Sequence, residues 1–192
     1  MYMKQTAGLA HHDVSLENVM FSDEQQDHVK LIDLGMCLRV PSSGGGPQPT
    51  HLTPQSCRGK PSYVAPEVVR EEACDPFASD VWSLGVCLYA MLMGRPLYNS
   101  PEDLAFSVMA NGGIKDIVEA YEAYGLRPSE TAKDLVYLMC QSDPSHRITL
   151  EEVLLHPFLN TTTATTATTE NMLPPIIPPL LPLCLSEGVA RG

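Results

Sequence analysis

Hydrophobic positions follow two different patterns along the chain. In the first 40 residues, the apolar runs of NVMFS (18–22) and HVKLIDLG (28–35) lie on either side of the polar segment DEQQD. Short apolar runs separated by a polar segment are typical of two strands joined by a turn. Farther along, apolar residues recur at helical spacing. The sequence therefore predicts an α+β fold with a small β-hairpin on a mainly helical body.

Two helices are predicted between residues 81 and 112. The segment 81–93 (VWSLGVCLYAMLM) is apolar almost all round, so we expect a helix buried at the centre of the fold. In SPEDLAFSVMANGG, we expect Ser100 to cap the next helix, Pro101 to take its first position and Gly112 to end it.

Two more helices are predicted nearer the C-terminus. The segment 127–140 (RPSETAKDLVYLMC) places three large apolar residues on one helical face. Thr149 and Glu152 have the spacing of a capping box, in which each residue bonds the backbone of the other at the start of a helix. Both segments are expected to be surface helices packed through one face.

The composition changes abruptly after residue 160, where TTTATTATTE is followed by a proline-rich stretch. We predict one domain over residues 1–160 and a disordered tail over 161–192. The apolar stretch 173–185 has 13 residues and contains prolines, whereas a membrane-spanning helix needs about 20 apolar residues. No membrane anchor is expected. A ligand for a proline-binding partner is the alternative interpretation of the tail.

Charge and cysteine content narrow the class of protein. A formal net charge of −11 argues against binding to nucleic acid or to an anionic membrane, because those partners attract clustered Lys and Arg. The six cysteines form no C-x-x-C pair and no secretory signal opens the chain. We therefore expect reduced thiols and a cytoplasmic location, and leave the nucleus open.

The stretch GLAHHDVSLENVMF (8–21) carries the candidate chemistry. His11, His12 and Asp13 could be metal ligands, but adjacent side chains on a loop diverge and no other His or Cys cluster has suitable spacing, which disfavours zinc. Asn18 follows Asp13 by five residues, and Asp33 ends the second predicted strand.

HHDVSLEN resembles the catalytic loop of eukaryotic protein kinases of the Ser/Thr type, and VKLIDLG resembles the strand that ends in their metal-binding aspartate. RGKPSYVAPE, SDVWSLGV and DPSHRIT resemble three further motifs of that family. Each motif alone is weak, but five of them appear in family order between residues 9 and 158. The resemblance implies a protein kinase-like fold, namely its large C-terminal lobe.

The resemblance also implies roles for individual residues. Asp13 matches the catalytic base that orients the acceptor hydroxyl. Asn18 and Asp33 match the residues that hold Mg²⁺ on the phosphates of ATP. Met20 is expected to pack under the adenine, although a plain core role is an alternative.

Other matched residues are expected to be structural. Glu67 and Arg147 match a buried ion pair that ties the activation segment to the helical body. Asp80 is expected to accept hydrogen bonds from backbone amides of the catalytic loop, and His11 is a structural residue of that loop. The alternatives are a surface salt bridge for the pair and a simple helix cap for Asp80.

Two departures from the family pattern concern charge. His12 stands in place of the usual arginine that pairs with a phosphate on the activation loop, so phosphorylation at Ser56 is expected to matter less than usual. Ser15 stands where Ser/Thr kinases usually have a lysine, and Lys60 stands in place of the usual threonine. We hypothesise that Lys60 supplies the cation that position 15 lacks; the alternative is a lysine that points into solvent.

The third departure is that the 192 residues contain no G-x-G-x-x-G loop. The expectation is a Ser/Thr protein kinase, acting on hydroxyls of a protein substrate, whose chain is truncated so that the small nucleotide-binding lobe is missing. The isolated chain is then expected to be inactive. The alternative is a pseudokinase-like scaffold without catalysis, which the altered His12 and the missing lobe favour. The intact Asp13, Asn18 and Asp33 favour the kinase.

Overall fold

The computed structural model describes most of the domain predicted for the first 160 residues. The predicted tail (161–192) and Ser56 lie outside the described part. The described residues are 3–22, 28–40, 59–122 and 125–160.

Two pairs of short antiparallel strands lie in the N-terminal part. Strands β2 (Val19–Phe21) and β3 (Val29–Leu31) pair with Met20 opposite Lys30, which confirms the predicted hairpin. Strands β1 (Leu9–Ala10) and β4 (Leu38–Arg39) form a second pair that was not predicted, because two residues are too few to show an alternating pattern. Three short helical segments accompany them, namely η1 (Met3–Ala7), η2 (Leu16–Asn18) and η3 (Leu34–Met36).

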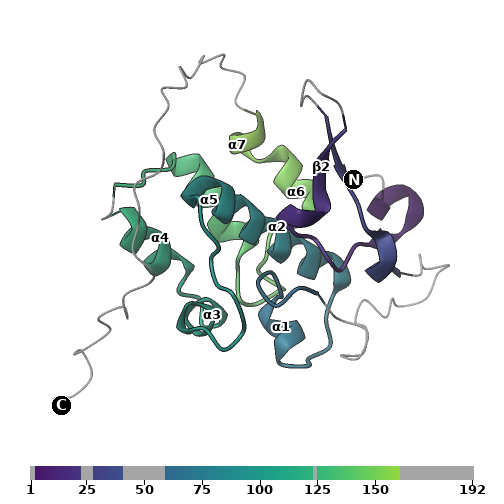
Figure 1. Ribbon diagram of the computed structural model, residues 1–192, viewed down its shortest axis with the longest axis horizontal. Helices are drawn as coiled ribbons and strands as arrows, with labels where there is room; N and C mark the ends of the chain where they lie inside the picture. Colours follow the sequence, from purple (N-terminus) through teal and green to yellow (C-terminus); the bar gives the residue numbers. More distant parts are fainter. Residues whose placement is uncertain (1–2, 23–27, 41–58, 123–124, 161–192) are drawn as a thin grey trace. The chain divides into compact units, whose positions relative to one another are not determined.

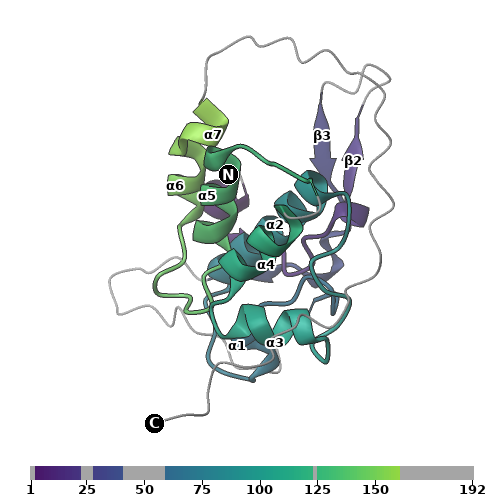
Figure 2. The ribbon, with the colours of Figure 1, turned by 90° about the vertical axis from the view of Figure 1, so that its left-hand side faces the viewer.

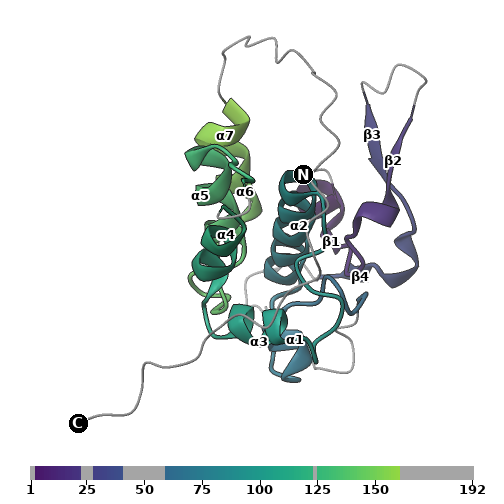
Figure 3. The ribbon, with the colours of Figure 1, turned by 60° about the vertical axis from the view of Figure 1, so that its left-hand side comes forward.

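The regular structure in the rest of the described chain is mainly helical. The α-helices are α1 (Pro66–Val69), α2 (Pro76–Met93), α3 (Leu104–Ala110), α4 (Ile114–Glu122), α5 (Glu130–Met139), α6 (Leu150–Leu155) and α7 (Pro157–Asn160). Figure 1 shows α2 at the centre, and α1 and α3 lie at one end of the domain in all three ribbon views. Helices α5 to α7 lie on one side of α2 and the hairpin β2–β3 on the other (Figures 2 and 3). The architecture agrees with the mainly helical α+β class expected from the sequence.

Helix α2 confirms the predicted central helix and begins five residues earlier than its apolar run. Asp75 caps it by accepting a hydrogen bond from the backbone N–H of Phe77, and Pro76 takes the first helical position. By length and hydropathy alone, α2 could cross a membrane. Its Trp82 and Tyr89 are fully buried within the domain, as expected for a core helix.

Helix α2 packs closely against α5. Val81 of α2 joins Leu135 and Met139 of α5 in one hydrophobic cluster. A Cβ atom added at Gly85 would lie 2.7 Å from the Cys140 sulfur and 2.8 Å from Met139 Cβ, so the absence of a side chain at Gly85 allows the close approach. This contact holds α2 close to the C-terminal end of α5.

The capping predictions had different outcomes. The box of Thr149 and Glu152 is present at the start of α6, as predicted. Helix α3 begins later than predicted, because Asp103 rather than Ser100 is its capping residue. The backbone N–H of Asp103 donates to the Ser100 carbonyl and closes a turn, so the chain from Pro101 to Asp103 is a turn and the helix starts after it.

The cysteines differ from expectation at one position. Cys37, Cys87 and Cys140 are free, but Cys74 is disulfide-bonded, so the expectation that all thiols are reduced is wrong there. Its partner lies outside the described residues. Sequence spacing alone does not determine which cysteines pair, and Cys74 has no cysteine near it in the chain.

Candidate active site

The loop between β1 and η2 is held by Asp80 in the first turns of α2. Asp80 Oδ2 accepts from the backbone N–H of His11 at 2.6 Å, and Oδ1 accepts from that of His12 at 2.8 Å. These are the loop hydrogen bonds expected of Asp80. Burial raises the pKa of Asp80 to about 6, against the lowering effect of the two amide donors.

His11 connects the loop to the strand that precedes Asp33. Its Nδ1 accepts from the backbone N–H of Asp13 at 3.3 Å. Nε2 therefore carries the ring proton and donates to the carbonyl oxygen of Ile32 at 3.1 Å. The ring is buried. His11 thus has a structural role in positioning Asp13, and both ring nitrogens are engaged within the protein.

His12 is buried and has an unusual backbone. Its φ of 61° lies in the left-handed region, which a non-glycine residue seldom adopts. His12 is predicted to stand in place of a phosphate-pairing arginine, and this stays a prediction because Ser56 lies outside the described residues. Among the described residues, no group of three His, Cys, Asp or Glu side chains is arranged to hold a metal ion.

Asn18 orients the carboxylate of Asp13. The Asn18 Nδ2 group donates to the Asp13 backbone carbonyl at 2.7 Å and to Asp13 Oδ2 at 2.8 Å. The backbone carbonyl of Asn18 accepts a hydrogen bond from the backbone N–H of Ile32 at 2.8 Å. This bond places Ile32, the residue before Asp33, next to Asn18. The structure therefore places Asn18 in contact with Asp13 and with the residue that precedes Asp33.

Asp33 is exposed and adopts a left-handed backbone with φ of 61°. Its Oδ1 accepts from the backbone N–H of Gly35 at 3.3 Å, a local contact that aspartate often makes in this conformation. The oxygens of Asn18 and Asp33 are the hard ligands that Mg²⁺ prefers, and Mg²⁺ is commonly bound by one or two carboxylates together with substrate phosphates. The donor set fits that ion.

Lys60 lies among the oxygens of the catalytic loop. Its Nζ donates to Ser15 Oγ at 2.7 Å and to Asn18 Oδ1 at 3.3 Å. It also lies 3.9 Å from Asp13 Oδ2 and 3.7 Å from Glu17 Oε2. These five residues are called the Lys60 cluster below. Lys60 therefore does not simply point into solvent. Its ammonium contacts Ser15 close to the Asp13 carboxylate.

Glu17, a member of the Lys60 cluster, and Tyr63, which contacts it, were not among the predicted site residues. Backbone hydrogen bonding, a hydrogen bond from Ser15 and the charge of Lys60 lower the pKa of Glu17. Burial and the Glu17 charge raise the pKa of Tyr63 to about 12. The segment SLEN could have indicated Glu17, because its carboxylate lies two residues from Ser15.

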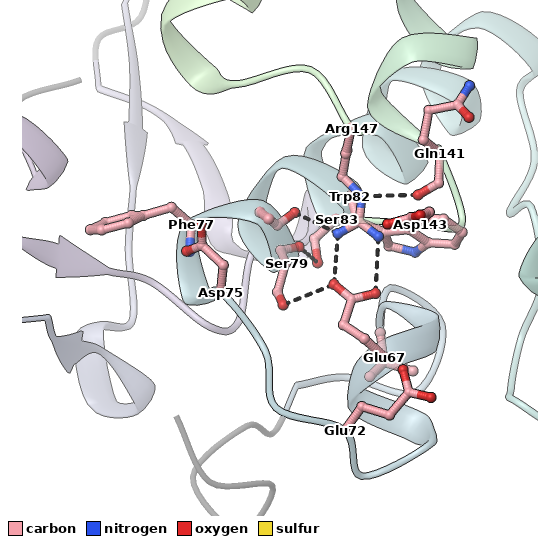
Figure 4. A network of polar contacts seen from close by, with 12 residues as sticks. Glu67, Glu72, Asp75, Phe77, Ser79, Trp82, Ser83, Gln141, Asp143 and Arg147 are labelled. Carbon is pink, nitrogen blue, oxygen red and sulfur yellow. Dashed lines mark hydrogen bonds and ion pairs between the residues drawn. The ribbon is translucent and has the colours of Figure 1, made fainter. Parts of the chain in front are cut away.

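Glu67 and Arg147 form a second, fully buried charged centre (Figure 4). Two parallel hydrogen bonds of 2.7 and 2.9 Å join the guanidinium to the carboxylate. Ser79 Oγ donates to Glu67 Oε1 at 3.3 Å, and the guanidinium lies over the Trp82 ring, 5.0 Å from its centroid. The ion pair has the geometry expected from the sequence. Ser79 and Trp82 were not predicted as its partners, because nothing in their spacing indicates contact with residue 147.

Met20 lies on β2 and is 53% exposed to solvent. This exposure excludes the plain core role for Met20 within the described residues. Large apolar side chains are exposed on the same hairpin and on the chain that follows it, namely Val19, Phe21, Val29, Ile32, Leu34 and Met36. An apolar surface of this kind is suited to contact with a flat apolar ligand or with another part of a protein.

A small cleft with a cavity volume of about 10 Å³ lies beside Asp13. Gly59, Lys60 and Tyr63 line it from one side, and Asp80 belongs to its wall. A hydroxyl placed in this cleft would lie next to the carboxylate of Asp13, which Asn18 orients. Geometrically, the arrangement is suited to proton transfer from a hydroxyl to Asp13, with a cation close by.

The sequence matches a family model described as the protein kinase domain over residues 1–159. Three relatives are similar over four-fifths of the chain. Serine/threonine-protein kinase PLK4 of Drosophila persimilis is 33% identical over 154 residues, which are 80% of this chain and 18% of that protein. The probable serine/threonine-protein kinase mkcF of Dictyostelium discoideum is 32% identical over 150 residues, 78% of this chain and 19% of that protein. Ribosomal protein S6 kinase alpha-3 of Mus musculus is 34% identical over 155 residues, 79% of this chain and 20% of that protein. The chain spans about a fifth of the length of the curated relatives it matches.

Proposed function

The chain belongs to the protein kinase family, and we propose that it transfers the γ-phosphoryl group of ATP to serine or threonine hydroxyls of a protein substrate. The observation that carries the proposal is the convergence of three side chains, because Asn18 donates to Asp13 Oδ2 at 2.8 Å and accepts from Lys60 Nζ at 3.3 Å. A scaffold without catalysis has no physical need for a base, an oriented amide and a cation at one place.

Asp13 is proposed as the base. Its Oδ2 is occupied by the Asn18 amide at 2.8 Å, which fixes the carboxylate plane and leaves Oδ1 as the natural acceptor for a substrate hydroxyl. His11 supports this position through the backbone N–H of Asp13. Phosphoryl transfer in this family depends mainly on positioning and electrostatic stabilisation, so a fixed carboxylate is what the reaction requires.

Asn18 and Asp33 are proposed to hold Mg²⁺ on the phosphates of ATP, and Met20 to contact the adenine. When bound, the metal ion neutralises charge on the phosphates. Both proposed ligand residues lie next to the paired strands β2 and β3, and the backbone bond from Ile32 to Asn18 keeps them near each other.

Lys60 is proposed to supply the cation for the transferred phosphoryl group. The 2.7 Å hydrogen bond between Lys60 Nζ and Ser15 Oγ supports this assignment. In the family pattern described above, the lysine and the hydroxyl residue stand at the opposite positions. Here the lysine is at position 60 and the hydroxyl at position 15, and the two groups are still in contact beside Asp13. The proposed relocation of the charge requires this contact.

We propose in addition that the 192 residues alone bind ATP weakly, because no glycine-rich loop occurs within them. The test measures transfer of labelled phosphate to a protein substrate by the chain alone and by the chain fused to the small nucleotide-binding lobe of a Ser/Thr protein kinase. We expect transfer by the fusion, and its loss in the same fusion carrying Asp13→Asn. A folded fusion that binds ATP but shows no Asp13-dependent transfer contradicts the kinase and favours the scaffold.

A further inference from the structure

Lys60 and Asn18 meet at the atom with which Asn18 would hold a metal ion. Lys60 Nζ donates to Asn18 Oδ1 at 3.3 Å, and an amide oxygen is the only metal-binding atom of asparagine. We propose that the Lys60 ammonium and a divalent cation compete for Asn18 Oδ1, so that Lys60 weakens the binding of the cation at Asn18. The proposal rests on the proposed function, which makes Asn18 a metal ligand.

Asn18 cannot offer its oxygen in another direction. Its Nδ2 group donates to the Asp13 backbone carbonyl and to Asp13 Oδ2, and the residue is buried. Turning the amide over would place Oδ1 against these two oxygens and would leave both without a donor, which is unfavourable in a buried site. The amide oxygen therefore faces Lys60.

Lys60 is held beside Asn18 by other oxygens as well. Ser15 Oγ is buried and accepts from Nζ at 2.7 Å, the shortest contact that this ammonium makes among the described residues. The carboxylates of Asp13 and Glu17 lie 3.9 and 3.7 Å from Nζ. If a metal ion took the Asn18 oxygen, these contacts would still keep the ammonium close to that ion.

Repulsion between the two cations then weakens metal binding. A divalent ion about 2.1 Å from the amide oxygen would lie at most about 5.4 Å from an ammonium that remains near its present position, 3.3 Å from the same oxygen. At that separation the repulsion between charges of +2 and +1 is appreciable even at the dielectric constant of water. Removing the Lys60 charge is expected to lower the half-saturating metal concentration at Asn18 by at least about tenfold. A lysine removed from an exposed site that makes no contact with Asn18 has a smaller effect, because water and salt screen it.

The experiment uses the 192-residue chain labelled with ¹⁵N, without nucleotide, and Mn²⁺ alone as the probe. The quantity measured is the Mn²⁺ concentration that halves the intensity of the Asn18 side-chain amide signals. The broadening caused by Mn²⁺ falls steeply with distance, so an ion bound at Asn18 affects this signal most. Ions bound elsewhere on the acidic chain contribute alike in the variants that are compared. Lys60→Met removes the ammonium, and Lys30→Met on β3 is the matched control, because Lys30 is exposed and the change in net charge is the same.

We expect the Mn²⁺ concentration to fall at least about tenfold in Lys60→Met and to stay within about twofold of the unmodified chain in Lys30→Met. The competition is wrong if the two variants shift the concentration equally. Lys60→Thr serves as the second variant if Lys60→Met does not fold, and the same tenfold change is required of it. If neither variant folds, Lys60 is a structural cation and the proposal is overturned. The Mn²⁺ titration does not measure turnover. If its result contradicts the competition, the kinase proposal is still tested separately by the Asp13-dependent transfer assay.

Discussion

The Glu67–Arg147 pair and the Lys60 cluster are two charged centres of opposite construction. Glu67 and Arg147 have side chains that are 1% and 0% exposed, and two short hydrogen bonds join them. The Lys60 side chain is 36% exposed. Among the described residues it makes one short contact, to Ser15, and three other oxygen atoms lie 3.3 to 3.9 Å from its ammonium. The first geometry suits a permanent structural tie. The second suits a cation that can exchange partners.

Helix α2 connects the two centres through consecutive residues. Ser79 donates to Glu67, whereas Asp80 accepts from the backbone of the catalytic loop. The first turns of one helix therefore hold both the structural pair and the loop that carries Asp13. The comparison indicates that changes at the buried pair should affect folding, and changes at Lys60 should affect chemistry.

The largest expected effect is the loss of stability in Glu67→Ala. Removing one partner leaves the Arg147 guanidinium buried without its carboxylate, which typically costs about 3 to 5 kcal/mol. The measurement is the free energy of unfolding in urea. Glu151→Ala is the control, because it breaks the partly exposed pair of Glu151 with Lys4 and should cost no more than about 1 kcal/mol. Equal losses in the two variants would mean that burial does not distinguish the pairs.

The next prediction concerns rate rather than stability. In the fusion that binds ATP, Lys60→Met should lower kcat about a hundredfold, on the order of 3 kcal/mol, because a positioned cation beside a transferring phosphoryl group is lost. The Michaelis constant for ATP should change little. The free energy of unfolding of the 192-residue chain should change by less than about 1 kcal/mol, in contrast to Glu67→Ala.

The double variant Ser15→Lys with Lys60→Thr is the matched control for that prediction. It has the same net charge as the unmodified chain and restores the residue types that the family usually has at these positions. It should recover much of the kcat lost in Lys60→Met. Nearly full kcat in Lys60→Met itself would show that Lys60 has no part in the transfer step.

A third prediction concerns pH and Asp80. Its pKa of about 6 lies above the ordinary value of 3.8, so the folded chain binds the proton more tightly than the unfolded chain. The resulting stabilisation is complete below about pH 4 and is lost as the pH rises through about 6, with a size on the order of 2 to 3 kcal/mol. Unfolding free energies measured between pH 4 and 7 should show this decrease. In Asp80→Asn that part of the pH dependence should disappear; an unchanged profile would assign it to other groups.

Those features of the fold and the site that depend on local pattern or on motif order could be predicted from the sequence. The hairpin, the central helix and the Thr149 box follow from periodicity and capping chemistry. The motifs indicated the Glu67–Arg147 pair and the meeting of Ser15 with Lys60. The contact of Lys60 with Asn18 was missed, because side-chain direction depends on how the loop folds.

Other misses have the same physical origin. The helix α3 starts at Leu104 because a turn closed by Asp103 competes with the cap predicted at Ser100. The disulfide at Cys74 was missed because pairing between distant cysteines leaves no trace in their spacing. Ser79 reaches Glu67 across the start of α2, so its role depends on tertiary packing rather than on any local pattern.

The smallest expected effect is that of Ser79→Ala, which tests whether the buried pair depends on its neighbour. Ser79 Oγ donates to Glu67 Oε1 at 3.3 Å, while the same oxygen also accepts from Arg147 at 2.7 Å. Because Glu67 keeps both bonds from the guanidinium, losing the hydroxyl should cost only about 1 kcal/mol of unfolding free energy. Ser107→Ala is the matched control, since Ser107 is exposed on α3 and the same change there should be neutral or slightly stabilising. A loss in Ser79→Ala close to that in Glu67→Ala would mean that the pair needs the hydroxyl to form. In that case the two charged centres would not be as different as their exposures indicate.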